Sequence, residues 1–328
     1  MFNVEYGAPL YGVRRERLRG FLNRFSIDFG LDADFTVMLT DYKGEIAATG
    51  SLSKNVLKYI AVSEEEQGTG AAATVVSELI NYAYRSGIEH LFLFTKPKNE
   101  ILFSSLGFFP LAKTDEAVMM ENKKNGLSYY LNNLERPAEK NNIGAVVMNC
   151  NPFTLGHRYL IETAARELNA LHVFILSADE SEFSSAVRYD LVKRGTADLK
   201  NIFIHESADY LISHATFPTY FLKANANPET INSDLDITLF GTRIAPALNI
   251  SARFCGSEPF CPITRAYNGR LRALLPKFSI DFVEIPRFNG ISASKVREYM
   301  KRGEIEKVRE LVPETTYDYL ILRNDMKQ

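Results

Sequence analysis

Thr154, Gly156 and His157 lie between a short apolar run and a stretch with the residue spacing of a helix. A buried strand that ends in a tight turn and opens a helix leaves unpaired backbone N–H groups, and with the helix dipole these make an anion site. Gly156 has no Cβ and lets a ligand approach the backbone closely, while His157 adds a side-chain donor. This pattern indicates a phosphate site that suits ATP. Taken alone, it also fits a helix capped by Thr154 with a surface His157.

A second pattern of this kind, from Ser292 to Arg297, follows the apolar segment 280–285. Ser292 or Ser294 can cap the helix, and Lys295 and Arg297 supply charge-assisted donors for polyphosphate. A capped surface helix with solvated charges is the alternative for this segment alone. Two phosphate-type helix starts in one α/β segment favour a nucleotide site.

The second half of the chain, in which strand-like and helical stretches alternate, must position these two segments. Strands are predicted at 172–176, 201–205 and 251–255, and helices at 186–199 and 264–275. The stretch 236–248 fits either type, but its apolar spacing and length favour a helix. Alternation of this kind predicts a Rossmann-like fold with a parallel sheet covered by helices. In such sheets ligands collect at the carboxyl ends of the strands, where both segments lie. The residues from 304 to 311 and beyond are predicted to form a small helical cap.

The chain has 328 residues, which favours two domains. The polar stretch 132–142 predicts their boundary, with one domain at 1–132 and the other at 142–328. The hydrophobic fraction of 46% supports proper cores, and a net charge of -2 gives no sign of nucleic-acid binding. The first residues lack the features of a signal peptide, and no apolar run is long enough to span a bilayer. The three cysteines are predicted to be reduced thiols, so a cytoplasmic protein without membrane contact is expected.

The first domain is predicted to be α+β, with helices at 11–22 and after Gly70 and with strands at 35–40, 46–52, 56–62 and 91–95. Gln67, Gly70 and Ala72 form a turn that resembles the pyrophosphate loop of GCN5-related acetyltransferases. The resemblance covers most of residues 1–130 and implies that backbone N–H groups of this loop bind the pyrophosphate of coenzyme A. A glycine-rich connection without a ligand is the alternative.

The chemistry of this first domain is less evident than its fold. The three glutamates before the loop are interpreted as a solvated face. No catalytic base is identified, since Tyr82 and Tyr84 lie on the predicted helix and His90 fits a structural role equally well.

The residues around Thr154 and Arg297 resemble the nucleotidyltransferase superfamily, whose marks are a His/Thr-x-Gly-His turn and a later Ile-Ser-x-Thr/Ser-x-x-Arg segment. The resemblance implies that ATP binds with Mg2+ and that a nucleophile attacks the α-phosphorus while pyrophosphate leaves. It implies no covalent intermediate with the protein, so catalysis consists of positioning and electrostatic stabilisation. His157 and Thr154 would act at the α-phosphate, and Ser294 and Arg297 would hold the β- and γ-phosphates.

An acetyltransferase-like unit followed by such a unit resembles the citrate lyase ligase family over nearly the whole chain. The segments that carry this resemblance include 148–157, 213–221, 244–248 and 256–262. It implies that ATP and acetate give acetyl-adenylate and pyrophosphate. A thiol on the acyl carrier subunit of citrate lyase then takes the acetyl group and releases AMP. That thiol ends a coenzyme-A-like prosthetic group, which the glycine loop of the first domain is predicted to hold.

The resemblance also guides the choice of further nucleotide contacts. Besides the two helix starts, these are predicted at Asn151, Pro152, Phe153, Arg188, Lys193, Gly256 and Glu258. Arg188 and Lys193 fit a solvated helix face equally well. No metal-binding carboxylate cluster is expected, because phosphates and water largely hold the ion in this superfamily. Ser213, Thr216 and Tyr220 are candidates for an acetate pocket, with capping and core packing as the alternative.

Two other functions are considered beside the ligase. One is an adenylyltransferase that acts on a small phosphate-bearing substrate such as a pantetheine phosphate or a mononucleotide. The other is a regulatory protein that binds acetyl-CoA and ATP without turnover. Exchange of pyrophosphate into ATP separates the three, because only the ligase requires acetate for it and the regulatory protein shows none.

Overall fold

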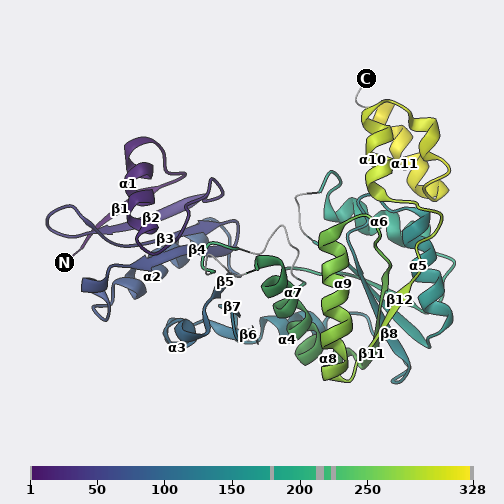
Figure 1. Ribbon diagram of the computed structural model, residues 1–328, viewed down its shortest axis with the longest axis horizontal. Coiled ribbons are helices and arrows are strands. Elements are labelled where there is room, and N and C mark those ends of the chain that lie inside the picture. Colours follow the sequence, from purple (N-terminus) through teal and green to yellow (C-terminus); the bar gives the residue numbers. More distant parts are fainter. Residues whose placement is uncertain (1, 178–180, 212–217, 223–226, 326–328) are drawn as a thin grey trace. The chain divides into compact units, whose positions relative to one another are not determined.

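The computed structural model describes residues 2–177, 181–211, 218–222 and 227–325, which form two compact units (Figure 1). The first unit contains Met1–Ser128 and Pro218–Ile231, and the second contains Tyr129–Phe217 and Asn232–Gln328. The described residues 218–222 and 227–231 thus belong to the first unit, although the sequence-based boundary assigns them to the second domain. Within the described ranges, no helix combines the length and apolar character needed to cross a membrane.

A seven-stranded sheet forms the core of the first unit, in the order β1-β2-β3-β4-β5-β7-β6. Its strands are β1 (Asn3–Gly7), β2 (Phe35–Thr40), β3 (Ile46–Ser53), β4 (Val56–Val62), β5 (Phe92–Thr95), β6 (Phe109–Lys113) and β7 (Val118–Glu121). Its helices are α1 (Gly12–Asn23), α2 (Ala71–Arg85) and α3 (Glu100–Ser105), with short 3-10 helices η1 (Glu64–Glu66) and η2 (Pro97–Asn99). Val75, Val76 and Leu79 recur at helical spacing and are fully buried, so α2 packs on the sheet through one apolar face.

The strands β4 and β5 diverge within this sheet. They are parallel, but they pair at only two positions, Val56 with Phe92 and Leu57 with Leu93. A register shift between β3 and β4 and the positive φ of Tyr59, at 57°, accompany the divergence. Residues beyond the paired positions line a cavity together with the first turn of α2.

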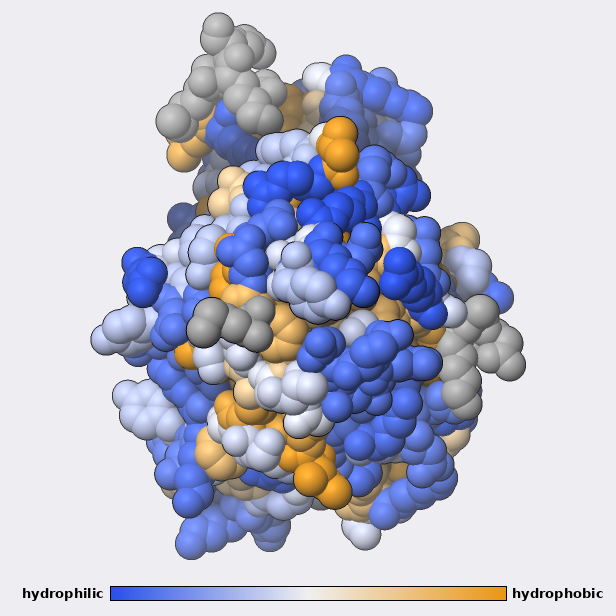
Figure 2. Space-filling model, turned by 90° about the vertical axis from the view of Figure 1, so that its left-hand side faces the viewer, coloured by the Kyte–Doolittle hydropathy of each residue, from blue (hydrophilic) through white to orange (hydrophobic). Residues whose placement is uncertain are grey.

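The outer surface of the molecule in the view of Figure 2 is mainly hydrophilic, with hydrophobic residues in small separate groups. Surfaces of this kind are usual for soluble proteins, and only larger contiguous apolar patches indicate docking sites. The described residues on this face therefore give no sign of an apolar docking surface.

The second unit contains a five-stranded parallel sheet in the order β10-β9-β8-β11-β12. Its strands are β8 (Ile143–Met148), β9 (Ala170–Ile175), β10 (Ile202–Glu206), β11 (Ile250–Gly256) and β12 (Asp281–Ile285). The helices in this half of the chain are α5 (Leu155–Arg166), α6 (Ser185–Gly195), α7 (Pro228–Leu239), α8 (Ala245–Leu248), α9 (Pro262–Leu274), α10 (Ala293–Lys301) and α11 (Glu314–Asp325). A π-helical segment, η3 (Phe240–Ile244), joins α7 to α8, while η4 (Leu275–Phe278) and η5 (Ile305–Val308) are 3-10 helices. The helix α4 (Gly126–Asn132) leads from the first unit into the second.

Helices cover both faces of the parallel sheet. Ile161 of α5 and Leu191 of α6 share a buried cluster with Phe254 of β11, so these two helices cover one face. The neighbouring Arg253 points the other way and contacts Phe240 of η3 and Tyr267 of α9, which cover the opposite face. The predicted Rossmann-like architecture is therefore confirmed, including the helix predicted at 236–248.

Candidate active site

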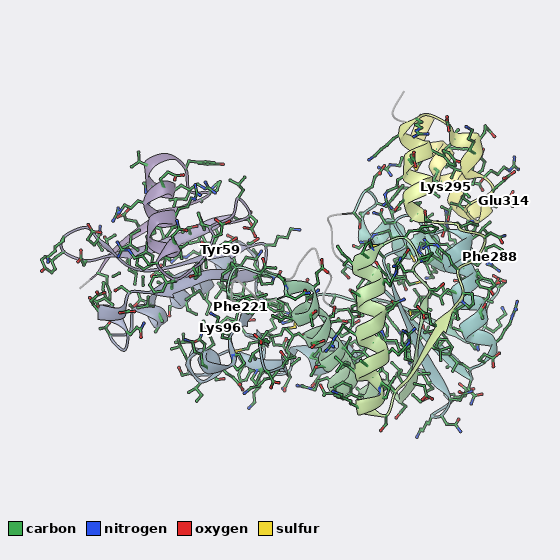
Figure 3. All side chains as sticks on the ribbon, in the orientation of Figure 1. Tyr59, Lys96, Phe221, Phe288, Lys295 and Glu314 are labelled. Atoms are coloured by element: carbon green, nitrogen blue, oxygen red, sulfur yellow. The ribbon has the colours of Figure 1, made fainter. Side chains whose placement is uncertain are left out.

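A cavity of about 530 Å³ lies in the second unit where β8 and β11 end. The ends of β8, β11 and β12, the starts of α5 and α10, and one face of α9 contribute its lining. From β8 the sheet continues to β9 on one side and to β11 on the other. The cavity therefore lies at the topological switch point, where open α/β sheets bind their ligands. Figure 3 labels Phe288, which lines it, and Lys295 in the first turn of α10.

Thr154 and His157 form a reciprocal cap at the start of α5. The Thr154 hydroxyl accepts a hydrogen bond from the backbone N–H of His157 at 3.3 Å, and the backbone N–H of Thr154 donates to Nδ1 of His157 at 3.1 Å. Because Nδ1 accepts, the proton of the neutral ring resides on Nε2. Nε2 has no hydrogen-bond partner among the described residues.

The electrostatic environment keeps this ring neutral. Burial, with a smaller contribution from the nearby Arg287 guanidinium, lowers the pKa of His157 to about 4. At neutral pH the ring is therefore uncharged and can offer an Nε2–H donor to a ligand in the cavity.

The two helix starts that the sequence singled out are in direct contact. Arg297 of α10 donates to the backbone carbonyl of Asn151 and, at 3.2 Å, to the hydroxyl of Ser294. A Cβ built on Gly156 would lie 3.4 Å from the carbonyl oxygen of Ile291, so any larger residue there would press on the approach to α10. The structure thus brings these two distant segments together on one cavity, which Thr154, Gly156 and His157 line together with Ser292 and Ser294.

The cap of α10 is provided by Ser292, whose hydroxyl accepts a hydrogen bond from the backbone N–H of Lys295 at 3.2 Å. Ser294 is exposed, and it meets the guanidinium of Arg297. The Lys295 side chain is also exposed, with its ammonium group 5.8 Å from the ring centre of Tyr299. Ser294 and Lys295, both predicted to bind polyphosphate, are therefore accessible to a ligand.

The residues of the turn before α5 are largely structural. Asn151 accepts a hydrogen bond from the backbone N–H of Phe183 at 3.2 Å through its side chain. Pro152 is buried, and Phe153 is fully buried against α6, where a Cβ on Gly195 would come within 2.6 Å of its ring. The side chains of these three residues hold the loop in place, so only their backbone can contribute to a ligand site.

The structure corrects the assignment of Arg188. Its side chain is fully buried and donates to the backbone carbonyls of Asn149, Leu176 and Phe183. Neither a phosphate ligand nor a solvated helix face describes it, because the guanidinium is committed to holding the ends of β8 and β9 against α6. Lys193 lies on the exposed side of α6 and is not part of the cavity lining.

Gly256, the last residue of β11, and Glu258 both line the cavity, but the carboxylate of Glu258 is already engaged. It accepts hydrogen bonds from the backbone N–H groups of Phe260 and Cys261 at 3.0 and 3.1 Å, and it pairs with Arg287 at 2.7 Å. These contacts hold the pKa of Glu258 below its usual range despite partial burial. Glu258 therefore fixes the loop and orients Arg287.

Arg287 and Phe288 are residues that the sequence-based reasoning missed. Both line the cavity just after β12, and the Phe288 ring stacks on Tyr159 of α5 with their centres 4.8 Å apart. Their position in the sequence could have identified them, because residues directly after a parallel strand lie at the edge of the sheet where ligands bind.

The three cysteines are unpaired thiols. Cys255 lines the cavity, and burial raises its pKa to about 12, so it is protonated and a poor nucleophile at neutral pH. Burial also raises the pKa of Cys150. Among the described residues, no group of three or more His, Cys, Asp or Glu side chains is placed to hold a metal ion.

A separate cavity of about 670 Å³ lies in the first unit between the diverging strands β4 and β5. Gln67, Gly70 and Ala72 line it, and Gly70 precedes α2 with a φ of 92°, which side chains other than glycine rarely adopt. Lys96 and Phe221 also line it and are labelled in Figure 3. The structure thus brings the predicted loop residues to one cavity.

The remaining candidates of the first unit lie in other surroundings. Among the three glutamates, Glu64 and Glu65 are exposed. His90 is bonded to the buried carboxylate of Glu121 at 2.6 Å, Tyr82 stacks on Phe35, and Tyr84 is 71% exposed. None of these last three side chains lines the cavity.

The residues considered for an acetate pocket are distributed differently from the prediction. Ser213 and Thr216 lie outside the described residues. Tyr220 belongs to the first unit, where it packs against Tyr59 with ring centres 4.6 Å apart and lines the first cavity.

Comparison with known proteins gives matches to both units. The model of the citrate lyase ligase C-terminal domain matches residues 143–320, and the model of the acetyltransferase (GNAT) family matches residues 8–108. The chain is 41% identical to the citrate (pro-3S)-lyase ligase of Klebsiella pneumoniae, with 94% of this chain and 93% of that protein covered. It is 39% identical to the protein of the same name from Escherichia coli, with 89% and 87% covered.

Proposed function

Because the chain belongs to the citrate lyase ligase family, we propose that the cavity of its second unit is where ATP and acetate react. The protein is an ATP-dependent ligase that acetylates citrate lyase. In the first half-reaction an acetate oxygen attacks the α-phosphorus, and the bond to pyrophosphate breaks. In the second, a thiol of the acyl carrier subunit attacks the acetyl carbon, and AMP leaves. The observation that carries this assignment is the contact of the two helix starts over one cavity at the switch point.

In the first half-reaction His157 donates its Nε2–H to a non-bridging oxygen of the α-phosphate. Negative charge grows there as acetate attacks, so a donor that is already oriented stabilises the transition state most. Thr154 holds the ring in the donating tautomer through its backbone N–H. Acetate is already anionic, so this step needs no strong general base.

The leaving pyrophosphate is held by the start of α10. Arg297, Lys295 and the hydroxyl of Ser294 supply donors for the β- and γ-phosphates, and Ser292 stabilises the helix start that carries them. The backbone of Gly156 lies at the other helix start and lines the same cavity, while Gly256 at the end of β11 is placed to meet the nucleoside.

Mg2+ fits this cavity as an ion bound to the nucleotide. Asp236 and Glu258 are the carboxylates among its described lining residues, and each already faces an arginine. We therefore expect phosphate oxygens and water to hold the ion, which neutralises charge on the phosphates when bound.

The decisive experiment follows labelled pyrophosphate into ATP with and without acetate. Exchange that requires acetate supports the proposed first half-reaction. Exchange that ignores acetate favours an adenylyltransferase, and tight binding of ATP without exchange or product favours a regulatory protein.

The first unit is assigned the prosthetic arm of the carrier subunit. Its cavity joins the start of α2, where backbone N–H groups can bind a pyrophosphate, to the gap between β4 and β5, which can take an extended arm. Gly70→Val tests this, because a side chain at a φ of 92° distorts the loop. Gly44→Val is the matched control, since Gly44 has a φ of 81° and equally open surroundings but lies away from the cavity.

We expect Gly70→Val to weaken acetylation of the carrier while acetate-dependent pyrophosphate exchange continues. Gly44→Val should leave both activities in place. If a folded Gly70→Val protein lost both pyrophosphate exchange and carrier acetylation, the separate roles proposed for the two units would be contradicted.

A further inference from the structure

Arg253 forms a buried cationic group in the wall of the second unit's cavity. Its side chain extends from β11 beneath α7 and α9 and is 3% exposed. The guanidinium lies over the ring of Phe240 at 4.4 Å. Its Nη2 atom donates to the hydroxyl of Tyr267 at 2.8 Å and lies 3.8 Å from the carboxylate of Asp236, which is also 3% exposed.

The second terminal nitrogen of this guanidinium is not satisfied. Nη1 is buried and has no hydrogen-bond partner among the described residues. The carboxylate of Asp236 faces Nη2 instead, and it accepts a hydrogen bond from the Tyr267 hydroxyl. A buried charged donor without a partner is costly, and in native proteins it calls for an explanation such as a bound ion or ligand.

We propose that Arg253 binds the carboxylate of the acid substrate, so that the part of the cavity beneath α7 and α9 is the acetate subsite. The inference rests on the proposed function. One carboxylate oxygen accepts a hydrogen bond from Nη1. The other attacks the α-phosphorus, forming the new P–O bond as the electron pair of the broken bond leaves with pyrophosphate. Tyr267 and Asp236 are positioning residues that fix the plane of the guanidinium.

The surroundings of Arg253 suit a short acid. Cys255, Thr264 and Leu271 also line the cavity, and Leu271 is 1% exposed. A guanidinium so little accessible can be reached only by a ligand with few atoms beyond its carboxylate. The methyl group of acetate meets an apolar wall there, whereas a longer chain would have to displace packed side chains.

The test compares two arginine–aspartate pairs that both involve α7, one with Arg253 of β11 and the other with Arg270 of α9. Arg253→Met with Asp236→Asn removes the proposed subsite without leaving one buried charge alone. Arg270→Met with Asp234→Asn removes the partly exposed pair, bonded at 2.6 Å, which is not part of the cavity lining. Both doubly substituted proteins are assayed for acetate-dependent pyrophosphate exchange, with circular dichroism to verify folding.

We expect the subsite variant to raise the KM for acetate by about 10- to 100-fold, as the loss of a charge-assisted hydrogen bond does, with little change in the KM for ATP. The control pair should leave both constants unchanged. Tyr267→Phe, which keeps the arginine, should raise the KM for acetate by less, and Arg253→Lys should restore part of the affinity. An unchanged KM for acetate in folded variants, or equal increases for acetate and ATP, would overturn the proposal.

A titration of carboxyl-labelled 13C-acetate into the protein with a non-hydrolysable ATP analogue separates this inference from the proposed function. A native protein that shows no acetate-dependent exchange would contradict the function alone. Acetate binding that the subsite variant loses would still support the subsite. Binding that persists in that variant, or no acetate binding by the native protein, would overturn it.

Discussion

The imidazole of His157 is expected to act as a neutral donor, and this leads to a specific prediction for His157→Ala. Removing one oriented donor at developing negative charge costs about 2.7–4 kcal/mol of transition-state stabilisation, or about 10²–10³ in kcat. The KM for ATP should change much less, because the donor bond strengthens as the α-phosphate gains charge. The assay is the initial rate of acetate-dependent pyrophosphate exchange at saturating ATP and acetate.

The pH profile distinguishes this mechanism from a charged histidine. The pKa of His157 is lowered to about 4, so the active, neutral ring persists as the pH falls past 6.5 and is lost only near 4. Exchange by the native protein should therefore show no inflection near pH 6.5. An inflection there that His157→Ala abolishes would refute the reasoning, because it would mean that the ring acts as a cation.

Unfolding in acid must be measured alongside activity in this experiment. Burial also lowers the pKa of His172 to about 4 and of His205 to about 3. A histidine with a lowered pKa binds fewer protons folded than unfolded, so stability falls as the pH drops below about 6.5 towards the folded value. Circular dichroism at each pH separates this loss from protonation of His157.

Five further substitutions have expected outcomes. Thr154→Ala and Ser184→Ala each remove a helix N-cap and should each cost about 1 kcal/mol in urea unfolding. Only Thr154→Ala should also lower kcat, because Thr154 shares its hydrogen bonds with the imidazole of His157, the proposed donor to the α-phosphate. Arg188→Met should destabilise the second unit by about 3 kcal/mol, because buried backbone carbonyls lose their hydrogen-bond donor. Lys193 is exposed, so Lys193→Met should unfold at the same urea concentration as the native protein and keep its KM for ATP. Arg297→Met should raise the KM for ATP about 10-fold or more, as expected for a lost charge-assisted contact, and an unchanged KM would remove it from the phosphate site.

Much of the second unit could be predicted because its signals are local. Glycine-bearing turns, capping serines and threonines, and alternating apolar segments each specify structure within a few residues, and β8, β11 and α10 appear where these signals place them. The convergence of the two helix starts on one cavity also followed, because both segments lie at carboxyl ends of parallel strands.

The features that were missed or misassigned depend on contacts between segments distant in the sequence. Arg188 is polar in sequence, and only the fold reveals three backbone carbonyls that converge on it. Arg253 was missed because its meaning depends on Asp236 and Tyr267, which come from two other elements. The strands β1, β6 and β7 were not predicted, since short strands are stabilised by neighbours distant in sequence.

The return of the chain to the first unit has a consequence for dissecting the protein. Tyr220 and Phe221 help to form the wall of the first unit's cavity, although they come from the far side of the polar boundary at 132–142. A fragment that stops at residue 132 would lack that wall and leave the aromatic surface of Tyr59 without its cover. The first unit is formed by two separate parts of the chain. A fragment that reproduces it must therefore contain residues 218–231 as well as its N-terminal part.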